Sequence, residues 1–84
     1  DIRYTRKGNT IYAIVLGWLG NNKPLTLTAF TNAVLGNQIP KIETVSILGY
    51  KNDVPFSMDE KGLHLKTPNQ EIDNKAFVIK IETK

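Results

Sequence analysis

Apolar and polar residues alternate along most of this chain, in short segments separated by turn residues roughly every ten positions. A period of two is typical of β-strands with one buried side, and almost no stretch shows the longer period of a helix. The pattern predicts about seven strands. They cover Ile2–Lys7, Thr10–Trp18, Pro24–Ala29, Lys41–Tyr50, Val54–Met58, Leu63–Lys66 and Lys75–Glu82.

The second strand, Thr10–Trp18, is apolar on both of its sides. One side carries Ile11, Ala13, Val15 and Gly17, and the other carries Tyr12, Ile14, Leu16 and Trp18. Strands that are buried on both faces show such runs. The pattern therefore predicts a central strand that is covered on both sides.

The segments between the strands contain the residues that turns favour. Gly8-Asn9 fits a two-residue hairpin loop, which requires positive φ. Thr26 and Thr28 form the outer side of the third strand. For Asn32–Pro40 we expect a loop with at most one helical turn, ended at Gly36.

Short strands with little or no helix bury their apolar sides best in two packed sheets. We therefore predict an all-β fold, an antiparallel β-sandwich of about seven strands in two packed sheets. A closed barrel of about five or six strands is the alternative. A chain of 84 residues is long enough for one core and too short for two domains.

Composition and charge narrow the possible partners. The formal net charge is +3, and lysine and arginine are spread from Arg3 to Lys84, whereas a nucleic-acid binder concentrates them on one stripe. The longest apolar run, Ile11–Leu19, is shorter than the roughly 18–20 residues of a membrane span. We expect no nucleic-acid partner and no membrane span. The absence of cysteine excludes disulfides and thiolate metal sites.

The sequence contains no pattern of a reaction centre. His64 is the one histidine, and its alternation places it on the outer side of a strand beside Lys66. Several carboxylates fall in predicted turns, where local backbone hydrogen bonds explain them: Asp53, Asp59, Glu60 and Asp73. We expect no catalytic residue, no metal site and no cofactor.

Aromatic side chains at strand ends are the remaining functional candidates. Trp18 and Tyr50 each end a strand at a turn, where a ring could contact a saccharide or a neighbouring domain. The alternative is that each ring packs into the edge of the sandwich, because aromatic residues dominate small cores. The other rings follow the alternation and are expected in the core: Tyr12, Phe30, Phe56 and Phe77.

Four segments carry a resemblance to a known family. They are Asp1–Trp18, Val45–Gly49, Lys61–Leu63 and Ala76–Glu82, in this order. Together they resemble the C-terminal domain of α-L-fucosidases of glycoside hydrolase family 29. The chain departs from many relatives at Leu19, where proline commonly follows Gly-Trp.

The resemblance implies a two-domain parent enzyme, of which this chain is a fragment. In that family a (β/α)8-like barrel removes terminal α-L-fucose from glycans with retention, using an aspartate nucleophile and a separate acid/base carboxylate. No motif of that barrel occurs here, so the chain is expected to be a non-catalytic accessory domain whose partner is the barrel. The Ile11–Leu19 strand or the Thr26–Thr28 side would dock on it. Family members are often exported, which implies a periplasmic or secreted protein.

Two other functions remain open. The first is an independent carbohydrate-binding module that contacts fucosylated glycan through Trp18 and Tyr50. The second is a general interaction domain of the immunoglobulin-like type, although the Cys…Trp…Cys spacing of antibody domains is missing.

Overall fold

The computed structural model describes residues 2–28 and 41–84, which form seven strands and no helix. None of the described segments is therefore a helix that could cross a membrane. The predicted loop at Asn32–Pro40 and the ring of Phe30 lie outside the described residues. The strands are β1 (Ile2–Lys7), β2 (Thr10–Leu16), β3 (Pro24–Leu27), β4 (Ile42–Ile47), β5 (Phe56–Asp59), β6 (Gly62–Lys66) and β7 (Ala76–Thr83).

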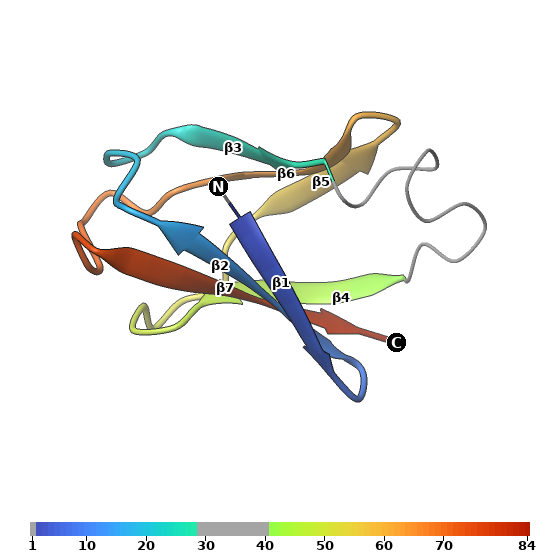
Figure 1. The fold of residues 1–84 in the computed structure, drawn as a ribbon. Helices are drawn as coiled ribbons and strands as arrows, with labels where there is room; N and C mark the ends of the chain where they lie inside the picture. The colour runs from blue at the N-terminus through green and yellow to red at the C-terminus, as the bar shows by residue number, and fades with distance from the viewer. Residues whose placement is uncertain (1, 29–40) are drawn as a thin grey trace.

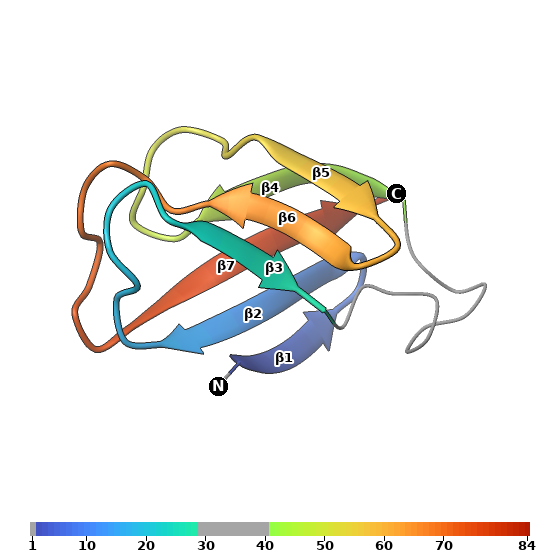
Figure 2. The same ribbon diagram turned by 90° about the horizontal axis from the view of Figure 1, so that it is seen from above.

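The strands form two antiparallel sheets that lie one over the other (Figures 1 and 2). The larger sheet has the order β1-β2-β7-β4, and the smaller has the order β3-β6-β5. No named strand pairs with strands of both sheets. The predicted β-sandwich is therefore confirmed, and the closed barrel is not formed.

Each sheet turns one face toward the other, and these inner faces supply the core. On β7 the inner residues are Phe77, Ile79 and Ile81, all buried. They pair with inner residues of β2 and β4, and Leu63 and Leu65 of β6 enter the same core cluster from the smaller sheet. The radius of gyration is 12.2 Å, against about 12 Å for a compact domain of this length. The two sheets thus bury a core of their own.

The prediction that β2 is covered on both faces is wrong for this chain. β2 is central, because it lies between β1 and β7, and its inner residues Ala13 and Val15 are buried. On its outer face, however, Leu16 is 54% exposed. Tyr12, expected in the core, also lies on this outer face and is half-buried, opposite Lys80 in the register. Alternation separates the two sides of a strand but does not say which side is covered when both are apolar.

Two predicted strands end earlier than expected. β2 ends at Leu16 and β4 ends at Ile47, so Trp18 and Tyr50 lie in the loops that follow these strands. Phe77 is buried as predicted, and Phe56 is half-buried against the core. Both candidate aromatics are therefore loop residues rather than strand residues.

Gly62, the first residue of β6, lies very close to the backbone at the end of the neighbouring strand β3. Its φ is +131°, and a Cβ atom there would overlap the backbone carbonyl oxygen of Leu27 in β3. Gly8, in the β1–β2 hairpin, also has positive φ (+61°) but faces open space. The two glycines therefore differ both in backbone strain, which is larger at φ +131°, and in close packing, which only Gly62 shows.

We predict that Gly62→Ala lowers the free energy of unfolding by about 3 kcal/mol or more, because strain and overlap add. Gly8→Ala should cost only about 1–2 kcal/mol, the cost of the left-handed conformation itself. Urea unfolding of both variants measures the difference. Equal losses would show that the contact with Leu27 is without consequence.

Candidate functional site

Three loops lie together at one end of the sandwich. They join β2 to β3 (17–23), β4 to β5 (48–55) and β6 to β7 (67–75), and Figures 1 and 2 both show them at the same end. Trp18 belongs to the first of these loops and Tyr50 to the second. Loop clusters on a rigid sandwich are common places for binding sites.

Trp18 packs into the edge of the core. Its ring meets that of Phe77 edge to face, with the centroids 5.1 Å apart. Its indole Nε1–H donates a hydrogen bond of 3.0 Å to the Asn21 side-chain oxygen, so the polar end of the ring is also engaged. The structure thus favours the packing role for Trp18.

Tyr50 lines a cleft of about 600 Å³ on the side of the smaller sheet, and Trp18 does not. The two candidate aromatics are therefore not brought together. Tyr50 is half-buried against the core, and its backbone N–H donates to the Ile47 carbonyl at 3.0 Å. The cleft is lined by Asn22, Pro24, Tyr50, Asp53, Val54, Pro55, Phe56, Ser57, His64, Leu65, Lys66, Thr67, Pro68 and Asn69, and is called the Tyr50 cleft below.

Thr67 holds two of the loops around this cleft together. It is 2% exposed, and its hydroxyl donates to the Gly20 carbonyl at 2.6 Å and accepts from the Lys23 backbone N–H at 2.7 Å. The Thr67 backbone N–H donates to the Lys23 carbonyl at 2.8 Å. Because all of these partners belong to the β2–β3 loop, one buried hydroxyl fixes that loop against the start of the β6–β7 loop.

We predict that Thr67→Val lowers the free energy of unfolding by about 1–3 kcal/mol, because the Lys23 N–H and the Gly20 carbonyl lose their partner. Thr67→Ser retains the hydroxyl and should cost clearly less. Thermal or urea unfolding of the two variants decides between them. Equal losses would mean that the methyl group, and not the hydroxyl, holds the loops.

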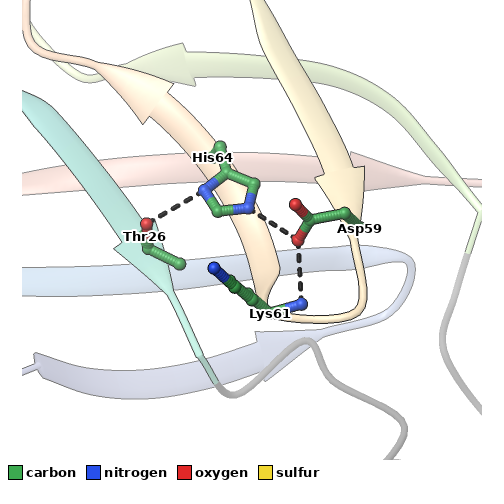
Figure 3. A network of polar contacts seen from close by, with 4 residues as sticks. All are labelled: Thr26, Asp59, Lys61 and His64. Carbon is green, nitrogen blue, oxygen red and sulfur yellow. Dashed lines mark hydrogen bonds and ion pairs between the residues drawn. The ribbon is translucent and has the colours of Figure 1, made fainter.

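A polar network crosses the outer face of the smaller sheet (Figure 3). His64 of β6 lies between Thr26 of β3 and Asp59 of β5, with Nδ1 2.9 Å from the threonine hydroxyl and Nε2 2.7 Å from the carboxylate. Asp59 also accepts from the Lys61 backbone N–H at 2.8 Å. In the neutral tautomer that carries its hydrogen on Nε2, the Nε2–H group donates to Asp59 and Nδ1 accepts from the Thr26 hydroxyl.

The order hydroxyl, imidazole, carboxylate is that of a nucleophile activated by a base. Of the three residues only His64 lines the Tyr50 cleft, so a ligand in that cleft would not lie against the Thr26 hydroxyl or the Asp59 carboxylate. The network instead ties the three strands of the sheet together. His64 does lie on the outer face as predicted, but it is half-buried and bonded at both ring nitrogens.

The same network sets the acidity of Asp59. The hydrogen bond from His64, followed by that from the Lys61 N–H, holds the pKa of this carboxyl below its ordinary value of 3.8. Hydrogen bonds to the charged form stabilise it. A carboxyl whose pKa is lower in the folded state than in the unfolded state stabilises the fold at higher pH.

We predict that Asp59→Asn is less stable than the original protein above about pH 5, where Asp59 is ionised in both the folded and the unfolded state. The difference in the free energy of unfolding between the two proteins should shrink as the pH falls below 3.8. It should disappear once the pH is below the lower pKa that Asp59 has in the folded state. Urea unfolding of both proteins from neutral pH to about pH 2 measures it. A difference that stays constant across this range would contradict the assignment.

Sequence reasoning missed the residues that shape the Tyr50 cleft, above all Thr67 and the amides of Asn22 and Asn69. The available signal was that asparagine occurs in all three loops of this end, in Asn21-Asn22, Asn52-Asp53 and Pro68-Asn69. Nothing in the spacing indicates that these loops meet.

For a metal ion, no group of three or more histidine, cysteine, aspartate or glutamate side chains comes together within residues 2–28 and 41–84.

Comparison with known proteins identifies a matching family model. The family model described as the alpha-L-fucosidase C-terminal domain matches residues 1–82. A search of curated proteins found no match.

Proposed function

The chain belongs to the α-L-fucosidase C-terminal domain family, and from this membership we propose that it is the accessory domain that packs on the catalytic domain of its parent enzyme and stabilises it. A C-terminal domain of a fucosidase implies a catalytic domain in the same chain. The observation that carries the proposal is an apolar surface on the outside of the larger sheet.

This surface consists of six side chains from three neighbouring segments and is called the outer apolar patch. Ile14 of β2 is opposite Val78 of β7, and Leu16 is opposite Ala76. The Leu48 N–H donates to the Val78 carbonyl at 3.0 Å, which places Leu48 in the same row beyond β7. The patch comprises Tyr12, Ile14, Leu16, Leu48, Ala76 and Val78.

Its most prominent members are exposed to solvent. Leu16 is 54% exposed and Leu48 is 48% exposed. Contiguous exposed apolar surface on a sheet is typical of an interaction site. Covering the exposed part of a leucine contributes about 1 kcal/mol, because burying the whole side chain contributes about 1.5–3.

The outer face of the smaller sheet has a different character. It carries Thr26, His64 and Lys66, and the first two are engaged in the polar network. Polar and charged side chains such as these are stable in contact with water. The contrast favours docking through β2 and β7 rather than through the Thr26–Thr28 side.

The rim of the patch indicates the chemistry of its partner. Arg3 of β1 is opposite Ile14 and Lys80 of β7 is opposite Tyr12, so both cations lie beside the patch. Lys80 already has a carboxylate partner, because its Nζ lies 3.5 Å from Glu82. A complementary surface of the catalytic domain would therefore be apolar at its centre, with a carboxylate facing Arg3. A catalytic domain in the same chain would also be tethered to this domain, which raises the effective concentration of the two surfaces.

The reaction itself belongs to the catalytic domain in this proposal. The parent enzyme would release terminal α-L-fucose with retention, using two carboxylates about 5–5.5 Å apart. The resemblance transfers neither carboxylate to this chain. We also propose, on the family resemblance alone, that the parent enzyme is exported to the periplasm or the medium.

We predict that the double variant Leu16→Lys/Leu48→Lys weakens the contact between the domains in the two-domain enzyme by about 3 kcal/mol, because two apolar contacts are lost and two charges must be desolvated. Calorimetry should then show the catalytic domain melting at a lower temperature, and activity should decay faster on heating. In the 84-residue chain alone each substitution should change stability by less than about 0.5 kcal/mol.

Glu60→Lys is the control, because it adds positive charge at an exposed position in the β5–β6 turn of the opposite sheet, outside the Tyr50 cleft. It should leave the melting of the two-domain enzyme unchanged. If the double variant also left it unchanged, the outer apolar patch would not be the docking surface.

A further inference from the structure

The Tyr50 cleft and the outer apolar patch share no residue. The cleft is lined by β5, β6 and the loops, whereas the patch lies on the outer face of the opposite sheet. A domain that covers the patch therefore leaves the cleft available. The cleft needs an explanation of its own.

We infer that the Tyr50 cleft binds a neutral saccharide, the part of a fucosylated glycan that lies beyond the terminal fucose. The inference rests on the proposed function in one respect, that the parent enzyme acts on glycans.

The charges in the lining exclude a strongly ionic ligand. Asp53 and Lys66 contribute one negative and one positive charge, so the cleft has no excess of either sign from these groups. A phosphate or carboxylate ligand would need converging cations. A neutral ligand fits this balance better.

The uncharged groups match the two kinds of surface that a sugar presents. Asn22, Ser57 and Asn69 are exposed and offer both donors and acceptors, as hydroxyl groups require. Tyr50 and Phe56 provide aromatic surface for C–H groups, and Tyr50 adds a phenolic hydroxyl. Mostly apolar walls with a few polar groups are the usual composition of a ligand site.

The backbone that carries Asn22 and Asn69 is held in place before any ligand arrives. The bonds of Thr67 fix the β2–β3 loop, and the Asn22 N–H donates to the Pro68 carbonyl at 3.1 Å, next to Asn69. His64 is fixed from both sides by Thr26 and Asp59 (Figure 3). A preorganised site loses less conformational entropy on binding.

The position of the cleft suits a glycan that extends from a neighbouring active site. The loops around the cleft begin or end beside Leu16, Leu48 and Ala76, so the cleft and the outer apolar patch lie toward the same end of the sandwich. A domain docked on the patch would therefore lie close to this end. The cleft would hold the distal part of a substrate and contribute to affinity rather than to bond cleavage.

The first test is an amide NMR titration of the 84-residue chain, which buries a core of its own, with a fucosylated lactose trisaccharide and with fucose alone. We expect saturable shifts at Tyr50, Asn22 and the Asn69 side-chain amide, stronger for the trisaccharide. Asn69→Ala should weaken binding about fivefold or more, because a donor and an acceptor are lost. Asn74→Ala is the matched control: it changes the same residue type in the same loop, exposed but outside the cleft.

Tyr50→Phe tests the hydroxyl without removing the ring that packs on the core, and should weaken binding less than Asn69→Ala. Shifts that do not saturate, or that are the same in Asn69→Ala and Asn74→Ala, would overturn the inference. Shifts confined to the outer apolar patch would overturn it as well.

The second test uses the two-domain enzyme and separates this inference from the proposed docking. Asn69→Ala should raise the KM for the fucosylated trisaccharide several-fold and leave kcat, thermal stability and the KM for an aryl fucoside unchanged. A failure of docking shows itself in thermal stability and in the Leu16→Lys/Leu48→Lys variant. An unchanged KM for the trisaccharide in Asn69→Ala would overturn the saccharide site, whatever the outcome for docking.

Discussion

The burial of one face of β7 is the constraint on which the rest of this structure depends. β7 pairs with β2 on one side and β4 on the other, and its inner residues Phe77, Ile79 and Ile81 lie under the smaller sheet. Because successive residues of a strand point to opposite sides, fixing these three inward also fixes Ala76 and Val78 outward. Formation of the core therefore determines which residues of β7 lie in the outer apolar patch. It does not require these outward residues to be apolar.

The two outer faces consequently serve different purposes in our account. On the smaller sheet the outward residues form a bonded polar network, and the loops beside it enclose the Tyr50 cleft. On the larger sheet Leu16 and Leu48 remain in contact with water. One face is suited to water and to a small polar ligand, and the other is suited to a protein surface. An accessory domain that stabilises its catalytic domain while holding substrate would use both.

Much of the fold follows from local pattern, and the site does not. The period of two correctly assigns Leu63 and Leu65 of β6 to the inner face and His64 and Lys66 to the outer face, because this strand has one apolar side. It fails at Tyr12, because β2 is apolar on both sides and only the assembled sheet decides which is covered. Thr26 and His64 are 38 positions apart, so their contact depends on the register of β3 against β6. Nothing in the sequence around Thr67, which stands between Lys66 and Pro68, indicates that its hydroxyl joins two loops.

The central claim is that the outer apolar patch is covered by the catalytic domain, and side-chain footprinting tests it most directly. Hydroxyl-radical labelling of the 84-residue chain and of the two-domain enzyme would be compared residue by residue. Our account predicts that Leu16, Leu48 and Tyr12 are labelled in the chain alone and protected several-fold in the two-domain enzyme. Met58, which is 36% exposed on the smaller sheet, should be labelled equally in both. Equal labelling of Leu16 and Leu48 in the two proteins, or protection at Met58 instead, would contradict the account.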